Sequence, residues 1–548
     1  MPNAARVVGQ VLRDRRLLLL STAFLGFNAT EFGVWVVILV YAYGLGGATA
    51  AAAAAMVQLI PAAIAAPLGA YAGDRFPRGR VLLAGYAVQA VTLLVTAFAL
   101  ALSAPPPLAL AIAATNSAAI TFTRPTHYAL LPDVTTSAEA LTGANAVSGL
   151  AEGAGMLLGP FLAGIVLAVS GPAAALVVFG AASALSALQM IGVRVEAVAM
   201  DETAPAVAMG ARDVVAETLR GFGVLRAEAA VRLPIAILFM TQIVVGALDV
   251  LLVAVAIDLL GAGEGWAGYL SAAFGLGGIV GAAVAVSLAG RRRLTPALGT
   301  GSIIFGGPLA MRGAVPLLLA APVFGGASGR GRSLASIAGN TLLQRAAPPH
   351  AMARVFGVLE TVTAIALGIG SVLASVLVAS AGIRLSLVIA GVIVPVSVVA
   401  LWLPLRAVER DAQAPDARLL ALLRSMPIFA PLPAPTMERI LASLERRELL
   451  AGQTLIREGD PGDRCYILAE GDVDVFQGGE RVAVRHGVDI LGEIALLRNI
   501  PRTATVVAAS PLVLYALERG PFLEAVTGHP QARATAEQAA AERMGQGH

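Results

Sequence analysis

The sequence has no lysine, one cysteine and few charged residues of any kind. Charged side chains make up 13% of its 548 residues, roughly half the share found in soluble domains. Together with 57% hydrophobic residues, this scarcity excludes an ordinary soluble protein and predicts a chain that lies mostly within a lipid bilayer. The single Cys465 excludes an internal disulfide and any CxxC metal or redox motif.

Arginine supplies every fixed positive charge because lysine is absent. The arginines lie between apolar segments rather than in one patch, so they do not indicate a nucleic-acid partner. The sequence also shows no nucleophile–base motif and no cluster of metal ligands. We therefore expect neither an enzyme nor a metal site.

Apolar runs of about 20 residues, the length that crosses a bilayer, follow one another up to about Leu405. They predict an α-helical membrane protein of about twelve spans. The first six lie near 17–43, 47–73, 80–103, 107–131, 141–169 and 172–194, and the second six near 233–260, 266–289, 294–311, 314–344, 354–380 and 383–405.

Arginine-bearing segments alternate with near-neutral turns between these spans. The positive-inside rule places the arginine-bearing segments, at 74–80, 194–232, 291–293 and 345–354, in the cytoplasm. An even number of spans returns the chain to its starting side. We expect a multi-pass protein of a bacterial inner membrane with both termini in the cytoplasm.

The two sets of six spans resemble each other. LLPDVTTSAEALTGANAV at 130–147 parallels LLQRAAPPHAMARVFGVL at 342–359. Two parallel six-helix halves are the arrangement of secondary transporters that rock around a midplane site. The sequence therefore predicts halves at 1–195 and 233–409, joined by a cytoplasmic connector at 196–232; a duplicated bundle without transport is the alternative.

The loop PLGAYAGDRFPRGRV at 67–81 resembles the cytoplasmic signature of the major facilitator superfamily, although Ala70 stands where a glycine is usual. The resemblance implies a transporter of that fold, in which this loop forms a breakable charge latch that holds one face shut. Ordinary basic loop residues are the alternative. The matching positions are Asp74, Arg75, Arg78 and Arg80.

Span five contains GMLLGPFLAG, in which Gly155, Gly159 and Pro160 resemble the GxxxGP signature of proton-coupled antiporters, with Ala163 replacing a glycine. Small residues four apart let helices approach closely, and proline bends a helix into a hinge. The resemblance favours an exporter. Plain helix packing is the alternative.

A carboxylate in mid-membrane costs about 2.5–3.5 kcal/mol on insertion scales, so it is rarely idle. Glu31 interrupts span one, and Asp249 lies at a similar depth in span seven. We predict that Glu31 carries the coupling proton and that Asp249 is its partner or a cation contact; structural hydrogen bonds are the alternative.

The predicted cavity has few polar side chains, which favours a lipophilic or amphipathic substrate over a sugar. Asn28 is expected on the cavity wall. Arg124, near the cytoplasmic end of span four, is a further candidate for proton coupling or the substrate cavity; extension of its side chain toward the membrane surface is the alternative.

Beyond Glu409 the charge density rises, and 410–548 is long enough for one small soluble domain. Apolar residues at helical spacing predict helix over 417–449. From Leu450, short strands alternate with glycine turns at Gly452, Gly459, Gly462 and Gly471, as a compact β-roll requires. The predicted fold is therefore a small α+β domain.

ILGEIALLRNIPRTATVVAA at 490–509 strongly resembles the phosphate-binding cassette of cyclic-nucleotide-binding domains, and the match extends over nearly all of 418–528. The resemblance implies that a short helix opening at Gly492 cradles the cyclic phosphate and that Arg502 neutralises it. It also implies that Glu493 accepts the ribose 2′-hydroxyl. The further cassette residues are Ile494, Ala495, Thr503 and Ala504.

Thr503 is compatible with both cAMP and cGMP. Two departures from the family pattern bear on base selectivity and turn geometry: the tail at 529–548 has no obvious aromatic lid, and Val488 replaces a usual glycine. No covalent cofactor is expected, and cAMP, or cGMP, is the expected regulatory ligand.

The sequence thus predicts a proton-coupled exporter of a lipophilic or amphipathic molecule, regulated by a cyclic nucleotide. Its expected partners are membrane lipids, protons, a cyclic nucleotide and a small-molecule substrate. A lipid or lysolipid flippase, a nucleotide-sensing transceptor without flux, and a carrier of the nucleotide itself are the alternatives.

Overall fold

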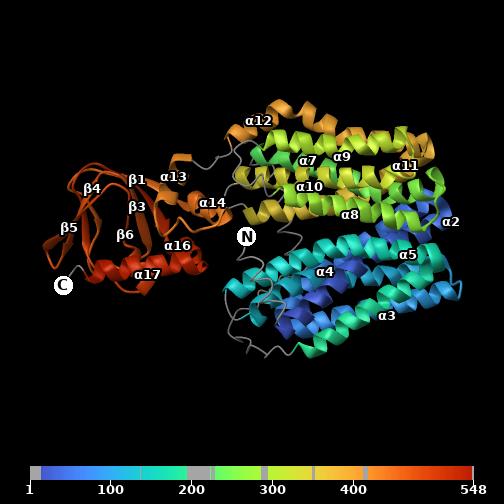
Figure 1. The fold of residues 1–548 in the computed structure, drawn as a ribbon, viewed down its shortest axis with the longest axis horizontal. Helices are drawn as coiled ribbons and strands as arrows, with labels where there is room; N and C mark the ends of the chain where they lie inside the picture. Colours follow the sequence, from blue (N-terminus) through green and yellow to red (C-terminus); the bar gives the residue numbers. More distant parts are fainter. Residues whose placement is uncertain are drawn as a thin grey trace. The chain divides into compact units, whose positions relative to one another are not determined.

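The chain forms two compact units, Met1–Ala412 and Gln413–His548, in a computed structural model. The structure describes residues 14–135, 138–193, 223, 229–285, 294–347, 352–411 and 417–545, with the backbone alone for 63–75 and a few further positions. Figure 1 labels the helices and strands of both units.

The first unit is built from long helices. Three of them contain a glycine in the left-handed region, where a Cβ would be strained: Gly47 (φ 63°), Gly171 (φ 76°) and Gly382 (φ 78°). Each of these helices is therefore two rods joined by a tight turn, and the described residues hold twelve rods. The helices are α2 (Arg15–Arg75), α3 (Arg78–Ala101), α4 (Pro106–Val134), α5 (Ala138–Gly192), α7 (Ala229–Ala254), α8 (Gly265–Ala285), α9 (Thr295–Ala314), α10 (Ala320–Ala346) and α11 (Met352–Ala400).

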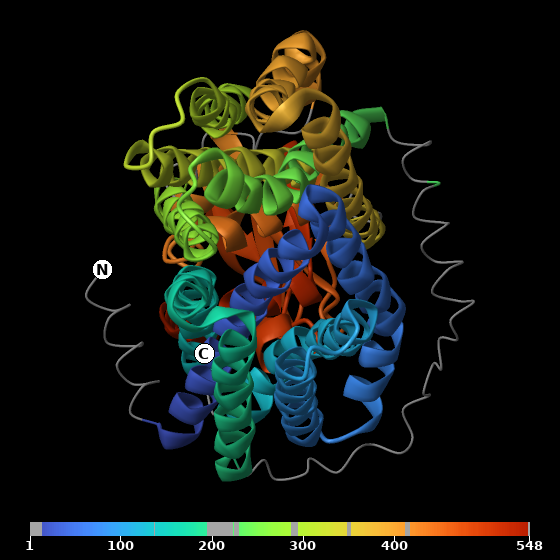
Figure 2. The ribbon, with the colours of Figure 1, turned by 90° about the vertical axis from the view of Figure 1, so that its right-hand side faces the viewer.

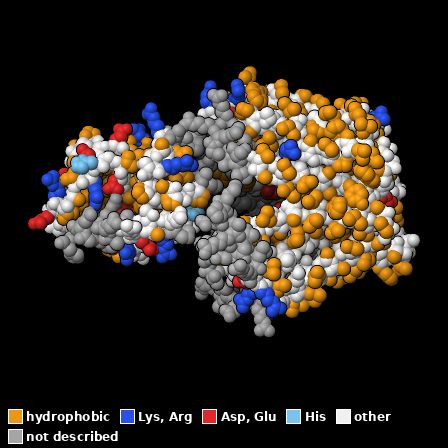
Figure 3. Space-filling model, in the orientation of Figure 1, with side chains coloured by type: hydrophobic (Ala, Val, Ile, Leu, Met, Phe, Trp, Pro, Cys, Tyr) orange, Lys and Arg blue, Asp and Glu red, His pale blue; other side chains and the backbone are white. Residues whose placement is uncertain are grey.

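Six of these helices, α2, α3, α5, α7, α8 and α11, are long and apolar enough to cross a membrane. Apolar side chains cover the face of the helical unit seen in Figure 3. Exposed fractions reach 81% for Val169 and 86% for Leu319. A surface of this kind is unfavourable in water and fits contact with lipid. The predicted multi-pass helical membrane protein is confirmed.

Two predicted spans have different ends. The run predicted at 314–344 begins at Ala320, and Pro316 disfavours helix at Val315, so α9 ends at Ala314 before it. The run predicted at 383–405 ends at Ala400, and a separate helix α12 (Trp402–Asp411) follows. Pro404 lies in the first turn of α12, where a missing N–H is tolerated.

The second unit is a β-roll with flanking helices. Its strands form two four-stranded antiparallel sheets, in the orders β1-β8-β3-β6 and β2-β7-β4-β5. The strands are β1 (Glu445–Leu449), β2 (Thr454–Ile456), β3 (Arg464–Glu470), β4 (Asp472–Gln477), β5 (Glu480–His486), β6 (Asp489–Leu491), β7 (Thr505–Ala508) and β8 (Leu512–Glu518). The helices are α13 (Ala417–Ser425), α14 (Ala434–Ser443), α15 (Glu493–Arg498), α16 (Arg519–Thr527) and α17 (Pro530–Gly545).

The prediction of continuous helix over 417–449 is wrong in two places. A proline-rich turn separates α13 from α14, and residues 445–449 form β1, which pairs with β8. Of the predicted turn glycines, Gly452, Gly459 and Gly471 have positive φ. Gly462 serves differently: a Cβ there would lie 2.8 Å from the Cβ of Ala495, so glycine lets α15 approach.

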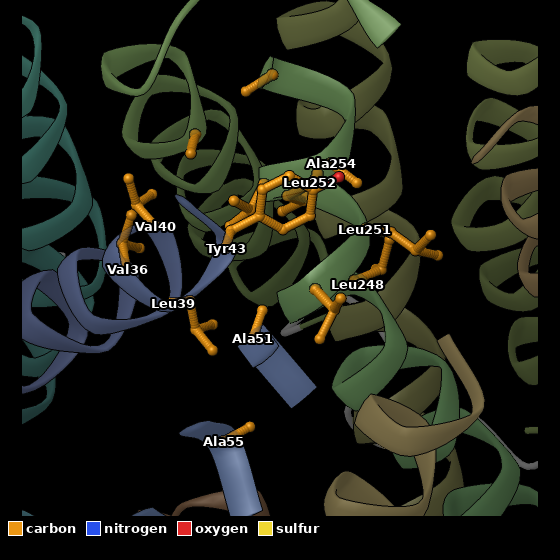
Figure 4. Packing of buried hydrophobic residues seen from close by; sticks show 14 of the residues in the cluster. Val36, Leu39, Val40, Tyr43, Ala51, Ala55, Leu248, Leu251, Leu252 and Ala254 are labelled. Carbon is orange, nitrogen blue, oxygen red and sulfur yellow. The ribbon is translucent and has the colours of Figure 1, made fainter. Parts of the chain in front are cut away.

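The helical unit divides into two groups, α2–α5 and α7–α11, which Figure 2 shows in blue to teal and in green to gold. One apolar cluster joins both groups: it contains Val40 and Ala51 of α2 together with Leu251 of α7 (Figure 4). This cluster lies toward the glycine turns. On the opposite side, the described apolar clusters belong to one group or the other.

The positions of these apolar clusters indicate on which side the two helix groups meet. The two groups share an apolar core on the side of the turns at Gly47 and Gly382, and they separate toward the side of the arginine-bearing loops. In the predicted orientation, the separated side faces the cytoplasm.

Helix α5 approaches its neighbours at backbone distance. A Cβ on Gly155 would lie 2.9 Å from the Ala29 nitrogen, and one on Gly159 would lie 2.9 Å from the Gly33 nitrogen, both on α2. Further along α5, a Cβ on Gly164 would lie 2.7 Å from the carbonyl oxygen of Gly265 on α8. The glycines of α5 therefore connect the two groups as well as the helices of the first.

We expect Gly159→Ala to lower the thermal stability of the purified protein, because the new methyl group overpacks the contact between α2 and α5. Overpacking of this kind costs about 1–3 kcal/mol. The measurement is the melting temperature in detergent. Gly149→Ala on the same helix is the matched control, because nothing lies within 4 Å of its Cβ position. Equal melting temperatures for the two variants would contradict the packing role.

Candidate functional site

A cluster of charges lies among three helices of the first group. The Arg124 guanidinium on α4 donates to Glu31 on α2 at 2.5 Å and also to Glu152 on α5. The Tyr128 hydroxyl, one turn after Arg124, donates to Glu152 at 3.3 Å. One arginine therefore holds two carboxylates from two other helices.

The close packing of α2 and α5 brings these groups together. Glu152 lies one turn before Gly155, which contacts α2 at Asn28 and Ala29. Asn28 is fully buried, and its Nδ2 donates to the Phe24 carbonyl of its own helix at 2.7 Å. The structure thus places Asn28 in helix packing, whereas Arg124, a candidate for the same site, is the centre of the cluster.

Asp249 is not part of this cluster. On α7, it interacts with the Trp35 side chain of α2 and, through charge, with Arg332 of α10. The nearest charge that acts on Asp249 is that of Arg332, which it attracts without forming an ion pair, and its predicted role as partner of Glu31 or cation contact stays a prediction. Trp35 lies one turn after Glu31, so α2 carries both contacts on adjacent turns.

In the predicted latch between α2 and α3, the described side chains are those of Arg78 and Arg80. Arg78 pairs with Asp133 of α4 at 2.9 Å and donates to the Ala129 carbonyl at 2.9 Å. Arg80 is exposed. The side chains of Asp74 and Arg75 lie outside the described residues.

Sequence reasoning missed three acids. Asp133, in the last turn of α4, pairs with Arg78, and Glu152 of α5 pairs with Arg124. Asp258 accepts a hydrogen bond from the Tyr43 hydroxyl and lies in a π-helical turn, η1 (Val255–Leu259). A search of the sequence for an arginine or tyrosine on another span that could pair with each membrane acid would have pointed to these acids. The Tyr43–Asp258 contact joins α2 to η1 on the side of the shared apolar core.

In the second unit, Arg502 is held by backbone. Its side chain is 5% exposed, and it donates to the carbonyls of Gly492 at 2.8 Å and Arg464 at 2.6 Å. Asp463 is its ion-pair partner within the described residues, at 3.4 Å, and that carboxylate is 63% exposed. The guanidinium is thus fixed in place while its charge is only loosely compensated.

Gly492 and Glu493 begin the predicted phosphate-binding turn. Gly492 has φ 77°, and a Cβ there would lie 3.0 Å from Ile456 and 3.3 Å from the Arg502 Cζ atom, so both backbone and space require glycine. Glu493 is 1% exposed and opens α15. Ala495 is buried, and the partly exposed cassette residues are Ile494, Thr503 and Ala504.

Two titratable groups beside Arg502 are shifted. Burial raises the pKa of Cys465 well above its usual value, and the Glu493 charge adds to this effect, so the thiol stays protonated. Burial alone would raise the pKa of Asp463, but the hydrogen bond and charge of Arg464 outweigh it and hold that pKa below its usual range. Asp463 therefore stays ionised at neutral pH.

A phosphate fits these groups. A fixed, loosely compensated guanidinium is a strong donor for a phosphate oxygen, and the lack of a side chain at Gly492 leaves space for that guanidinium. Glu493, with its acceptor oxygens, suits a hydroxyl donor. Together these groups suit a ligand that carries one phosphate and a free hydroxyl, as a nucleotide does.

The described residues contain no group of three or more His, Cys, Asp or Glu that could hold a metal ion. The charged side chains described above instead meet as carboxylate–guanidinium pairs.

Comparisons with known proteins agree with both units. The sequence profile of the Major Facilitator Superfamily matches residues 18–365 and, overlapping, 235–452. The profile of the cyclic nucleotide-binding domain matches residues 446–529.

The second unit is similar to curated kinase subunits. The cAMP-dependent protein kinase regulatory subunit of Colletotrichum orbiculare is 34% identical over 102 residues, which cover 18% of this chain and 26% of that protein. The type II regulatory subunit of Drosophila melanogaster is 32% identical over 106 residues, or 19% and 28% of the two chains. This chain thus spans about a quarter of the length of these relatives.

Among solved structures, the regulatory domain of Toxoplasma gondii PKA with cAMP is 31% identical, with a TM-score of 0.19, and the match covers 23% of this chain and 46% of that one. The helical bundle and its profile match extend over most of the sequence. The chain belongs to the major facilitator superfamily and carries a C-terminal segment that matches the cyclic nucleotide-binding domain.

Proposed function

We propose that this chain is a proton-coupled secondary transporter that exports a lipophilic or amphipathic small molecule and is regulated by a cyclic nucleotide. The observation that carries the transport proposal is the pairing of Arg124 with both Glu31 and Glu152. We further propose six-helix halves at 1–195 and 233–409, a connector at 196–232 and a nucleotide-binding domain at 410–548. Its setting is a bacterial inner membrane, with both termini cytoplasmic.

The charge cluster suits proton exchange. With both acids ionised, two carboxylates share one guanidinium, and the cluster carries one excess negative charge. A proton on Glu31 removes that excess while Arg124 keeps Glu152, so no charge is left buried and unpaired. Because Glu31 is on α2 and its partners are on α4 and α5, proton binding changes how α2 is held within the first half.

The conformation is consistent with loading from the cytoplasm. The halves separate on the side of the arginine-bearing loops and share a core on the other side, where Tyr43 bonds Asp258. An exporter binds its substrate in such a state and then closes this side. The Arg78–Asp133 ion pair lies at the separated side, so closing of this side either keeps the pair or breaks it.

The regulatory ligand is proposed to be cAMP, with cGMP as the second candidate. The relatives named above are cAMP-dependent kinase subunits, and a cGMP-dependent protein kinase of Caenorhabditis briggsae is 40% identical over 72 residues. Arg502 and the turn at Gly492 hold the cyclic phosphate, Glu493 accepts the ribose hydroxyl, and Thr503 adds a hydroxyl beside Arg502.

Helix α12 is the proposed path of regulation, because it is the last helix before the nucleotide-binding domain. Its Leu405 is fully buried, and Trp402 occupies the space beside Gly299 of α9. Glu409 accepts the backbone N–H groups of Leu294 and of Thr295, the latter at 3.0 Å, and so caps α9. A pull on α12 therefore acts on the start of α9.

Lipid flipping is the second candidate, because the scarcity of polar cavity residues suits a lipid as well as a drug-like molecule. A transceptor without flux, or transport of the nucleotide itself, are less favoured. A flippase moves labelled lysolipid without a pH gradient, whereas the proposed exporter requires the gradient.

Glu31→Gln should reduce pH-driven transport at least tenfold, because the cluster then has one carboxylate for one guanidinium and no excess negative charge for a proton to neutralise. The measurement is movement of NBD-labelled dodecanoate in proteoliposomes with an imposed pH gradient. Glu360→Gln, which changes an exposed acid on α11, is the control. Undiminished coupling in Glu31→Gln would remove this residue from the mechanism.

Arg502→Glu should weaken cAMP binding about 100-fold or more, because it removes charge-assisted hydrogen bonds and adds a repelling charge. Calorimetry on the full-length protein measures this change, and basal transport should persist. Arg498→Glu, at the exposed end of α15, is the matched charge reversal. A wild-type protein that retains neither cAMP nor cGMP would refute the proposed ligand.

Glu409→Gln should uncouple the two units. We expect unchanged nucleotide affinity and basal transport, but at least a fivefold smaller effect of saturating cAMP on the transport rate, because the cap on α9 is weakened. Leu403→Ala, on the exposed side of α12, should respond like the wild type. A full cAMP response in Glu409→Gln would exclude this path.

A further inference from the structure

Arg332 of α10 differs from Arg124 in how its charge is compensated. Arg124 has carboxylates from two helices within hydrogen-bonding distance. Arg332 forms no ion pair or hydrogen bond with any described residue, and its buried Nε atom has no partner. Asp249 attracts it from α7 without reaching it, and the Phe274 ring lies 6.0 Å from the guanidinium carbon.

Arg312 of α9 is a second arginine of this kind. It is 1% exposed, and its Nη2 atom donates to the Ala321 carbonyl at 2.6 Å. Its Nε and Nη1 atoms have no partner among the described residues. Gly325 leaves room for the guanidinium, since a Cβ there would lie 2.8 Å from Nη2.

The two arginines lie along one seam between α8, α9 and α10. Gly325, beside the Arg312 guanidinium, and Arg332 are seven residues apart, which is two turns on the same face of α10. Phe274 of α8 and Phe305 of α9 contact each other, with ring centres 6.5 Å apart. Phe274 lies beside the Arg332 guanidinium, and Phe305 packs against Gly331, two turns before Arg312 along α9, so the aromatic pair lies at the Arg332 end of the seam.

The seam also has a direction. Arg312 lies near Ala321 and Leu309, which belong to the apolar core shared by the two halves, on the closed side of the bundle. Arg332 lies deeper along α10, near Asp249 of the opposing helix α7. A group bound at Arg332 would therefore reach Arg312 on its way to the side that is closed in this conformation.

A buried guanidinium with unpaired donors is strongly unfavourable unless an anion compensates it. Its planar fork matches carboxylate and phosphate oxygens. We infer that Arg332 and Arg312 successively bind the anionic group, carboxylate or phosphate, of an amphipathic substrate. The apolar part of that substrate then packs against the aromatic pair. This inference rests on the proposed transport function and names the substrate class.

The test measures binding to the full-length protein in phosphatidylcholine nanodiscs by calorimetry. The probes are lauroyl lysophosphatidate, laurate, inorganic phosphate and dodecyltrimethylammonium. The wild type should bind at least one anionic amphiphile tenfold more tightly than the cationic one. Arg332→Gln and Arg312→Gln should each weaken that binding at least tenfold, and the lysine variants should restore part of it.

Arg330→Gln is the matched control, because Arg330 is exposed and lies two residues from Arg332. It should change the dissociation constant less than twofold. Lysophosphatidate binding without laurate binding assigns a phosphate headgroup, and the converse assigns a carboxylate. Inorganic phosphate bound as tightly as the amphiphiles would overturn the amphipathic substrate.

Stability separates a binding role from a structural one. In ligand-free protein, Arg312→Gln should keep or raise the melting temperature, because it removes a buried unpaired charge. A marked decrease would show that Arg312 has a structural role and would overturn its assignment as a substrate contact. The binding measurements on the glutamine and lysine variants of Arg332 would still decide the assignment of Arg332. Equal binding of cationic and anionic amphiphiles, or glutamine variants that bind like wild type, would overturn the inference. The tests at Glu31 and Arg502 do not depend on this result.

Discussion

The structure depends on one electrostatic constraint: a guanidinium surrounded by low-polarity protein needs an anion or a full set of acceptors. In a chain without lysine, every buried cation is an arginine, which stays charged in the interior. Arg124 meets this requirement with two carboxylates, and Arg502 with two backbone carbonyls and a distant acid. Arg332 and Arg312 have no carboxylate within hydrogen-bonding distance among the described residues, and some of their buried N–H donors have no acceptor there. These four environments distinguish a proposed coupling group, a proposed nucleotide contact and two proposed substrate contacts.

Close backbone contact makes the first of these environments possible. Glu152 reaches Arg124 because Gly155 and Gly159 let α5 lie directly against α2. The same helix reaches α8 in the other half through Gly164. Any rearrangement that moves α2 relative to α5 therefore changes the charge cluster, and any change in the cluster alters how α2 is held. The glycines of α5 and the acids around Arg124 therefore act together rather than as two independent motifs.

Much of this architecture was predictable from the sequence because membrane insertion leaves strong signals. Runs of apolar residues and glycine turns predicted the rods, and the cassette around Glu493 and Arg502 predicted the nucleotide pocket. Pairings between distant helices were not predictable in the same way. Nothing local to Arg124 shows that it faces Glu31 rather than the membrane surface, since that depends on the rotation of α4. The strand at Glu445–Leu449 was mistaken for helix because pairing with β8 outweighs the helical preference of its charged residues.

Helix α12 escaped prediction for a related reason, and it changes how regulation is understood. A continuous twelfth span would transmit a pull from the second unit along α11 and into the membrane. The break after Ala400 instead leads the chain onto the start of α9, where Glu409 accepts two backbone N–H groups. Helix α9 also carries Arg312. A nucleotide that displaces α12 would therefore act on the half that holds Arg332 and Arg312, whereas the proposed proton site lies in the other half. The proposed regulation and the proposed energy coupling thus lie in different halves, and the two effects should combine through the contacts that join the halves, among them those of Trp35, Gly164 and the Tyr43–Asp258 hydrogen bond.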